Sequence, residues 1–354
     1  MKKTIPYLSI IFLFIACGVP DNNSQLSSKS SDSLQLKRFD ESDFSPVIRN
    51  TYFAGLTNPL LNLPRNGERG ILIYHNGEES LDVKNARRLA RIFGKKVTIP
   101  HNSIIAETKS KEVLRFYREQ FARNSYDGLG AAINISADVN KAFPGDPQFR
   151  HNAMWIEEKQ ILLFGAGGRE FDSFIKGTDV VGHEFTHAVI STTSRLEYIG
   201  QSGALNEHFA DVFGEMFQQY IEPTNKPFLI GETITLDKLP LRNMLDPQSG
   251  LSKQPGHIQD IPEEFGPDCK PSPTNDSCGV HILSGIPNRF AALAIKELGW
   301  LKTRDIFYNV MTERLNSQAN FSDYADAILN ECYQIKLSDT DCSVIEKSLH
   351  TVGL

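Results

Sequence analysis

The chain has 354 residues, of which 40% are hydrophobic, and a formal net charge of −6. This is enough apolar material for one large domain or for two coupled lobes. The acidic balance provides no basic surface for phosphate groups, so we expect no nucleic-acid partner.

The first sixteen residues have the pattern of a signal peptide. A positive start at residues 1–3 precedes an apolar run from Ile5 to Ala16, which is too short to span a bilayer. The run ends in the letters FIACG, with Ala16 directly before Cys17. This resembles a bacterial lipoprotein signal, in which Cys17 becomes the lipid-carrying N-terminus. Ordinary secretion with cleavage nearby is the alternative.

Residues 17–43 follow the signal and are rich in Ser, Asn and Asp. Such a segment cannot bury a core, so we expect a flexible tether. Beyond it, Ile71–Tyr74 predicts a strand, and apolar spacing over Glu112–Phe121 predicts a helix. Residues 132–137 and 161–164 predict two more strands.

Asn152 and Ala153 open an extended stretch between those last two strands. It is either an edge strand that can pair with the backbone of a bound peptide or an ordinary strand. The pattern leaves both interpretations open.

The most informative stretch is HEFTH at residues 183–187, within a helix predicted over about 178–194. Residues four apart lie on one face of a helix, so His183 and His187 can bind the same ion. Glu184 lies beside that ion without having to bind it. This pattern of two histidine ligands and a carboxylate general base indicates a metalloprotease.

A second amphipathic helix is predicted around residues 203–217, with an apolar stripe on one side. Its other side presents Glu207 and, one turn later, Asp211. Catalytic zinc typically takes three protein ligands and keeps one position open, so Glu207 is the candidate third ligand. The alternative is two ordinary core helices. It is disfavoured because two inward-facing histidines and two acids are costly to bury without an ion.

The five cysteines fall into two local pairs and one remainder. Cys269 and Cys278 are close in sequence, as are Cys332 and Cys342, and Cys17 is left alone. Two local disulfides would indicate an oxidising, extracytoplasmic compartment. Four free buried thiols are the alternative.

With these residues laid out, the chain resembles the thermolysin family of zinc metallopeptidases (gluzincins) from about Tyr117 to the C-terminus. The step of twenty residues from His187 to Glu207 distinguishes this family from other HExxH peptidases. The resemblance implies an α+β, two-lobed fold with the zinc in the cleft between the lobes. A β-rich N-terminal lobe with the HExxH helix would cover residues 44–200, and a mainly helical lobe would cover residues 201–354.

The resemblance also implies roles for individual residues. His183, His187 and Glu207 would hold one catalytic Zn²⁺, and Glu184 would be the general base. The remaining roles are these: Asp211 and Asn206 hold the histidines, Tyr198 and His281 stabilise the oxyanion, Asp276 orients His281, and Arg242, Asn152 and Ala153 bind the substrate.

The implied reaction is the hydrolysis of peptide bonds, with Glu184 assisting the attack of a zinc-bound water. The side chains aligned with the pocket beyond the scissile bond are all apolar: Phe171, Phe174, Val180 and Leu241. We therefore expect cleavage before bulky apolar residues.

The family's double calcium site is a point of departure. Its acidic positions correspond here to Asp179, Gln218, Pro227 and Glu232, so two of the four carboxylates are missing. Hard cations need those carboxylates, so we predict that the double site is absent or much weakened.

Taken together, we expect a monomeric metalloendopeptidase outside the cytoplasm, anchored to the membrane through Cys17 or, alternatively, secreted. Its partners would be protein or peptide substrates. Two other classes stay open: a catalytically inactive surface-binding lipoprotein on the same scaffold, and a zinc hydrolase that acts on something other than peptides.

Overall fold

The computed structural model describes residues 71–75, 100–140 and 149–354, with side chains from residue 100 onward. The predicted signal peptide, Cys17 and the tether lie outside these residues. The main strands are β1 (Ile71–His75), β2 (Ile133–Val139), β3 (Ala153–Ile156) and β4 (Ile161–Gly165), and a short pair is formed by β5 (Leu229–Ile230) and β6 (Arg242–Asn243). The helices are α3 (His101–Phe121), α4 (Thr178–Ser191), α5 (Gly200–Ile221), α6 (Asp276–Leu283), α7 (Gly285–Leu298), α8 (Trp300–Asn309), α9 (Phe321–Gln334) and α10 (Asp339–Val352).

The four main strands form one sheet in the order β1-β2-β4-β3. The pairs β1–β2 and β2–β4 are parallel, whereas β3 runs antiparallel to β4. Among the strands that the structure describes, β3 is the terminal one on that side. Alternate residues of β4 point to opposite faces, as in any strand. Leu162 and Phe164 face the main core, whereas Leu163 packs with Met154 in a small cluster on the other face.

Helix α3 begins earlier than the sequence predicts, at His101 instead of Glu112. The apolar stripe of its second half includes Val113 and Phe116, both fully buried. The first half buries small residues, Ser103 and Ala106 among them, and these give no apolar periodicity. The first turns of α3 therefore lack the apolar periodicity by which the sequence predicts a helix.

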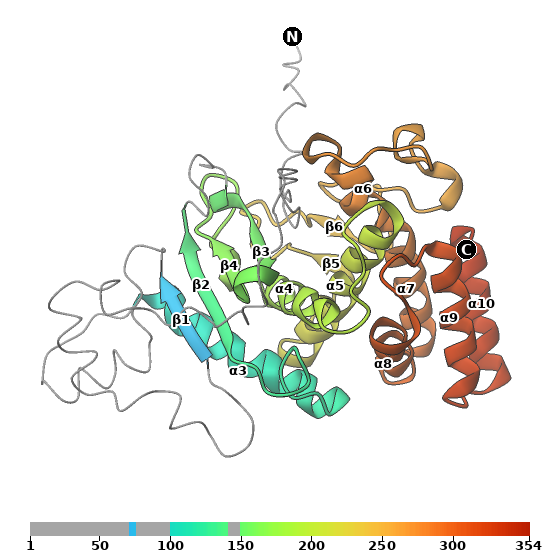
Figure 1. Cartoon of the computed structure of the whole chain (residues 1–354), viewed down its shortest axis with the longest axis horizontal. Helices are drawn as coiled ribbons and strands as arrows, with labels where there is room; N and C mark the ends of the chain where they lie inside the picture. Colours follow the sequence, from blue (N-terminus) through green and yellow to red (C-terminus); the bar gives the residue numbers. More distant parts are fainter. Residues whose placement is uncertain (1–70, 76–99, 141–148) are drawn as a thin grey trace, which may run out of the picture.

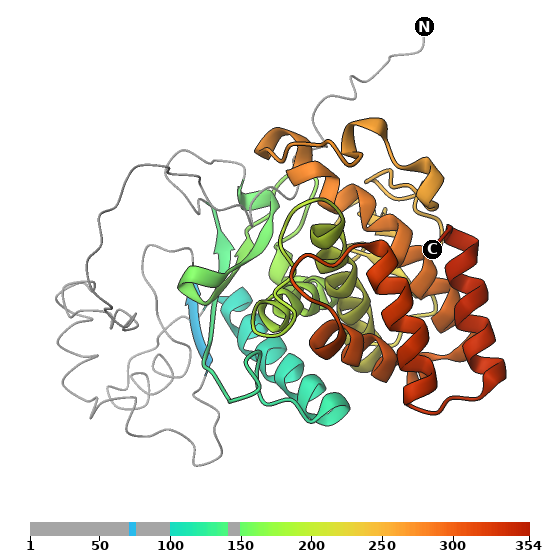
Figure 2. The ribbon, with the colours of Figure 1, turned by 45° about the vertical axis from the view of Figure 1, so that its right-hand side comes forward.

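Helices α4 and α5 lie between the sheet and the C-terminal helices (Figure 1). The sheet and α3 are on one side of this pair, and α7 to α10 are on the other, an arrangement that the rotated view in Figure 2 also shows. Every residue of α4 from Thr178 to Ile190 is buried. A helix that is buried all round must satisfy its polar side chains with partners inside the protein.

The C-terminal half is mainly helical, as expected. One disulfide, Cys332–Cys342, joins α9 to α10, and the other, Cys269–Cys278, closes a loop that runs into α6. Both predicted local pairings are therefore confirmed. By length and composition alone Pro273–Leu298 could cross a membrane, but 83% of its most apolar window is buried inside the protein, as in a core helix.

Candidate active site

The site is built where α4 and α5 cross, and two glycines bring the helices together. A Cβ on Gly214 would lie 2.6 Å from the carbonyl oxygen of Asp179, and a Cβ on Gly182 would lie 2.9 Å from the Cα of Gly214. No larger residue fits at either position without a shift of the backbone. This close approach allows short polar side chains of α5 to reach the histidines of α4.

His183, His187 and Glu207, here called the metal cluster, converge in this crossing. The Nε2 atoms of the two histidines are 3.0 Å apart, and each lies 3.4 Å from a carboxylate oxygen of Glu207. Ligand atoms bonded to a tetrahedral zinc ion lie about 3.3 Å from one another. Among the described residues, this is the one group of three or more His, Cys, Asp or Glu side chains spaced for a metal ion.

The outer ring nitrogens of both histidines are held by acceptors. His183 Nδ1 is 2.9 Å from Asp211 Oδ1, and His187 Nδ1 is 2.8 Å from Asn206 Oδ1. Each Nδ1 must therefore donate a proton, which turns the Nε2 lone pairs toward each other. Glu207 Oε2 is buried without a hydrogen-bond partner. A set of converging acceptors of this kind fits a Zn²⁺ ion.

The pKa values of the two histidines are shifted in opposite directions. Burial opposes a charge on both rings, but Asp211 and Glu207 outweigh it at His183 and raise its pKa to about 10. At His187, burial prevails and lowers the pKa to about 4. Burial also opposes the charge of Glu207, yet His281 and the other histidines hold its pKa well below the usual value. At neutral pH the raised pKa of His183 keeps a second proton on its ring, and a metal ion that binds Nε2 would displace it.

Glu184 is buried beside His183 and faces the strand side of the site. The backbone N–H of Trp155 on β3 donates to its carboxylate. Burial raises the pKa of Glu184 to about 7, against the charge of His183. A carboxyl group in this position can accept and return a proton near neutral pH.

His281, on α6, also lies next to the metal cluster. Its Nε2 is 3.0 Å from the Tyr198 hydroxyl and 3.4 Å from Glu207 Oε1. Asp276 binds both His281 Nδ1, at 2.6 Å, and the His281 backbone N–H, at 2.8 Å. Burial opposes protonation of His281, but Glu207 and Asp276 raise its pKa. Two donors, an imidazole and a phenol, thus face the metal cluster from one side.

Arg242 and Asn288 form a further layer around Asp211. The Arg242 guanidinium is buried and donates to both Asp211 oxygens, at 2.6 and 2.8 Å, and the Asn288 amide donates to Asp211 Oδ2 at 2.8 Å. Asn288 in turn contacts His208, which contacts Tyr324. Sequence reasoning missed Asn288, His208 and Tyr324. The one available signal was a histidine directly after the third candidate ligand.

The remaining residues predicted to bind substrate are on or near β3 and α4, or in the segments beside them. Asn152 precedes β3, and its side-chain oxygen accepts from the Ala153 backbone N–H at 2.9 Å. Because β3 is terminal in its sheet, a peptide could lie along it. The four predicted pocket residues are almost fully buried, and Phe171 and Phe174 are in ring contact at 5.6 Å: Phe171, Phe174, Val180 and Leu241. Their role in specificity stays a prediction.

Asp179, Glu215 and Glu232, here called the acid cluster, lie at the other end of the α4–α5 crossing. Burial raises the pKa of Asp179, that of Glu215 to about 8 and that of Glu232 to about 7. Gln218, at one of the altered calcium positions, donates to Glu232 at 3.0 Å and accepts from the Asp179 N–H at 3.3 Å. The predicted loss of the double calcium site stays a prediction.

The HExxH helix, the carboxylate from a second helix and the helical C-terminal half define the class, that of zinc metallopeptidases. Two family models then match the chain. One, described as the thermolysin metallopeptidase catalytic domain, covers residues 71–191, and the other, described as its alpha-helical domain, covers residues 194–354. The chain belongs to the thermolysin family of metallopeptidases.

Similar proteins carry related names. An extracellular elastase of Staphylococcus epidermidis is 37% identical over 218 residues, which are 60% of this chain and 39% of that protein. A gelatinase of Enterococcus faecalis is 32% identical over 87% of this chain and 58% of its own length. The protease PrtS of Photorhabdus is 31% identical over 77% of this chain and 75% of its own length. The chain thus spans well under half of the elastase.

A solved structure has the same fold. The precursor of protealysin, a metalloproteinase from Serratia proteamaculans, superimposes with a TM-score of 0.67 at 25% identity, over 88% of this chain and 95% of that one. The predicted thermolysin-like fold is therefore confirmed.

Proposed function

We propose that this chain is a zinc-dependent endopeptidase. The observation that carries the proposal is the convergence of His183, His187 and Glu207 on one point, with Glu184 and His281 next to them. The family and the names of the relatives, an elastase, a gelatinase and a protease, support a peptide substrate.

The residues of the chain divide the reaction between them. When bound, zinc supplies Lewis acidity, which lowers the pKa of a water molecule and polarises a carbonyl. Glu184 accepts a proton from the attacking water and returns it to the leaving nitrogen. His281 and Tyr198 donate to the negative oxygen that develops on the substrate carbonyl. Asp276 keeps the His281 ring in the orientation that this requires.

Asp211 and Asn206 keep the histidine lone pairs pointed at the ion through their bonds to the outer ring nitrogens. Asn152 and Ala153 present the terminal strand β3 to the substrate backbone, and Arg242 lies behind the metal cluster, where it neutralises Asp211. We propose that Arg242 also binds a substrate carbonyl.

The specificity proposed for this enzyme is cleavage before Leu, Phe, Ile or Val. It rests on four buried apolar side chains, one of them, Val180, on α4. A hydrophobic pocket favours apolar ligand groups through the area it buries. Sequencing of the peptides released from a protein digest tests this, and charged residues after most cuts would contradict it.

The site of action proposed is outside the cytoplasm. Two disulfides support it, because such bonds persist in oxidising compartments, and so does the name of the extracellular elastase. Anchoring through a lipid on Cys17 is the proposed mode. Mass spectrometry of the mature N-terminus distinguishes a lipidated Cys17 from a secreted, cleaved form.

The decisive experiment pairs metal content with hydrolysis of casein. Protein expressed from the full-length sequence is extracted with non-ionic detergent and assayed with and without a zinc chelator. We expect about one zinc per chain and cleavage that stops with the chelator. Bound zinc without cleavage of any peptide would favour an inactive binding protein or a hydrolase of other substrates. Absence of zinc would refute the metal site.

A further inference from the structure

The segment that carries His281 begins with an unusual turn. Asp276, Ser277, Cys278 and Gly279 all have positive φ, at 55°, 49°, 67° and 75°. Left-handed backbone is disfavoured for residues with a Cβ atom and normally occurs at single positions. Three of these four consecutive residues have side chains. Something outside the local backbone preference must therefore hold this turn.

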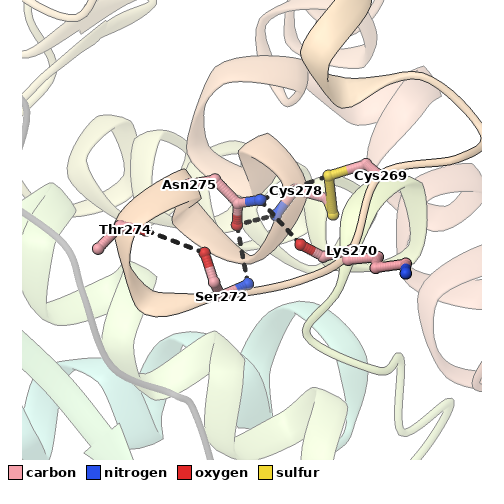
Figure 3. The surroundings of a disulfide bond; sticks show 6 residues. All are labelled: Cys269, Lys270, Ser272, Thr274, Asn275 and Cys278. Carbon is pink, nitrogen blue, oxygen red and sulfur yellow. Dashed lines mark hydrogen bonds between the residues drawn. A yellow bond between two sulfur atoms is a disulfide. The ribbon is translucent and has the colours of Figure 1, made fainter.

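The Cys269–Cys278 disulfide is the covalent part of that support (Figure 3). It ties the third residue of the turn to a chain segment nine positions earlier. Asn275 adds hydrogen bonds: its side-chain oxygen accepts from the backbone N–H groups of Cys278 and Ser272, at 3.2 and 2.8 Å, and its amide donates to the Lys270 carbonyl at 2.9 Å. The Cys269–Cys278 disulfide is here called the clamp. Its Cys278 end is 3% exposed, whereas its Cys269 end is half-buried.

The turn lies in the segment that carries His281, and the metal cluster comes from other elements. Asp276, its first residue, holds both the ring and the backbone N–H of His281. The segment from 276 to 281 thus folds back on itself, and the direction of the turn determines where the His281 ring lies. His183, His187 and Glu207 come from α4 and α5, which are outside this segment.

We propose that Cys269 and Cys278 are positioning residues for His281: their disulfide holds the left-handed turn that points His281 at the substrate carbonyl. The inference rests on the proposed function. It separates two parts of the site, because breaking the disulfide would free His281 and leave the metal cluster in place. Catalytic power depends on placement, and small displacements of a donor lower kcat strongly.

The test compares zinc-loaded, full-length enzymes that differ in one disulfide. The variant Cys269→Ser/Cys278→Ser removes the clamp. The matched control, Cys332→Ser/Cys342→Ser, removes a bridge of similar loop length, ten positions instead of nine, between two helices of the C-terminal half. The benchmark His281→Ala removes the oxyanion donor itself.

We expect the clamp variant to lose about 10- to 100-fold in kcat, toward the level of the benchmark. Its KM should change little and its zinc content should stay at that of the wild type. The control should keep kcat near that of the wild type. A second variant, Cys269→Ser/Cys278→Gly, should recover part of the lost kcat, because glycine adopts φ near +67° without a Cβ penalty.

A clamp variant as active as the control would overturn the inference, and so would a loss of kcat that only follows a loss of zinc. If the serine variant does not fold, the glycine variant decides, because full wild-type kcat in it would show that the clamp is dispensable. Failure of the proposed function is distinguishable, since then the wild type shows no chelator-sensitive cleavage or the benchmark keeps full kcat. Either of those results would overturn the positioning role as well.

Discussion

Two polar clusters that differ in nature lie at the crossing of α4 and α5. At one end of the α4–α5 crossing, the metal cluster combines two histidines with a carboxylate whose pKa is lowered. At the other end, the acid cluster combines carboxyl groups whose pKa values are raised. Burial disfavours charge in both clusters, and the pKa shifts differ in direction because Glu207 lies among histidines whereas Glu215 and Glu232 lie next to other acids.

Geometry separates the clusters further. The ligand atoms of the metal cluster lie within 4.8 Å of one another. The Nδ1 atoms of its two histidines are hydrogen-bonded to Asp211 and Asn206. Both clusters contain carboxylate oxygens without a hydrogen-bond partner: Glu207 Oε2 in the metal cluster, and Asp179 Oδ1, Glu215 Oε2 and Glu232 Oε2 in the acid cluster. The histidines thus distinguish the two clusters. Beside them the buried carboxylate of Glu207 keeps its charge, whereas Glu215 and Glu232, next to other acids, favour the protonated form.

The largest effect predicted concerns the base beside the metal cluster. Glu184→Gln keeps the shape of the side chain but cannot accept a proton, so hydrolysis should fall by about 10²- to 10⁴-fold. Zinc content, measured by elemental analysis, should stay at the wild-type value. Cleavage at the wild-type rate by this variant would show that Glu184 is not the base.

Asp211→Asn tests the hydrogen bond that orients the His183 ring. Loss of the carboxylate weakens the hold on His183 Nδ1 and removes a charge next to Arg242, so zinc affinity should fall by about 10- to 100-fold. Competition with a chromogenic chelator measures this directly. Asn206→Ala is the companion variant, and we expect a smaller loss because a neutral acceptor is removed. Unchanged zinc affinity in both variants would falsify the supporting role.

Glu215→Gln tests the acid cluster. The pKa of Glu215 is about 8 in the fold against an ordinary value of 4.5, so the folded state favours the protonated form. The wild type should therefore lose stability as the pH rises from about 4.5 to about 8, and the Gln variant should lose less. A shift of this size corresponds to at most about 4–5 kcal/mol. Structural relaxation on ionisation lowers this figure, so we expect about 1–3 kcal/mol.

Urea unfolding at pH 5 and pH 8.5 measures that difference. The measurements belong in a Glu184→Gln background, so that self-cleavage does not distort them. Glu158→Gln, an exposed acid outside the cluster, is the matched control and should leave the pH dependence unchanged. Equal pH dependence in the wild type and the Glu215 variant would contradict the raised pKa.

The smallest effect predicted is that of calcium. With Gln218 donating to Glu232 and two family carboxylates missing, the acid cluster should bind calcium weakly. Millimolar calcium should raise the melting temperature by less than about 2 °C. A rise of many degrees that disappears in Asp179→Asn would show that a calcium site has been kept.

The sequence alone predicted those parts of the site that depend on local periodicity. The spacing of His183 and His187 places both rings on one helical face whatever the rest of the fold is. The apolar stripe of α5 likewise fixes the side on which Glu207 lies. The two local disulfides followed from the cysteine spacing. His281 and Tyr198 came from the family resemblance, because no local pattern distinguishes them from ordinary buried residues.

Only the tertiary structure determined which residues that are distant in sequence contact one another. The approach of α4 to α5 at Gly182 and Gly214 brings Asp211 to His183, and α7 brings Asn288 to Asp211 from 77 positions away. The left-handed turn before His281 was also invisible, since three of its four residues disfavour that conformation. Helical periodicity is a property of neighbouring residues, whereas these contacts depend on packing between distant segments, which no local pattern encodes.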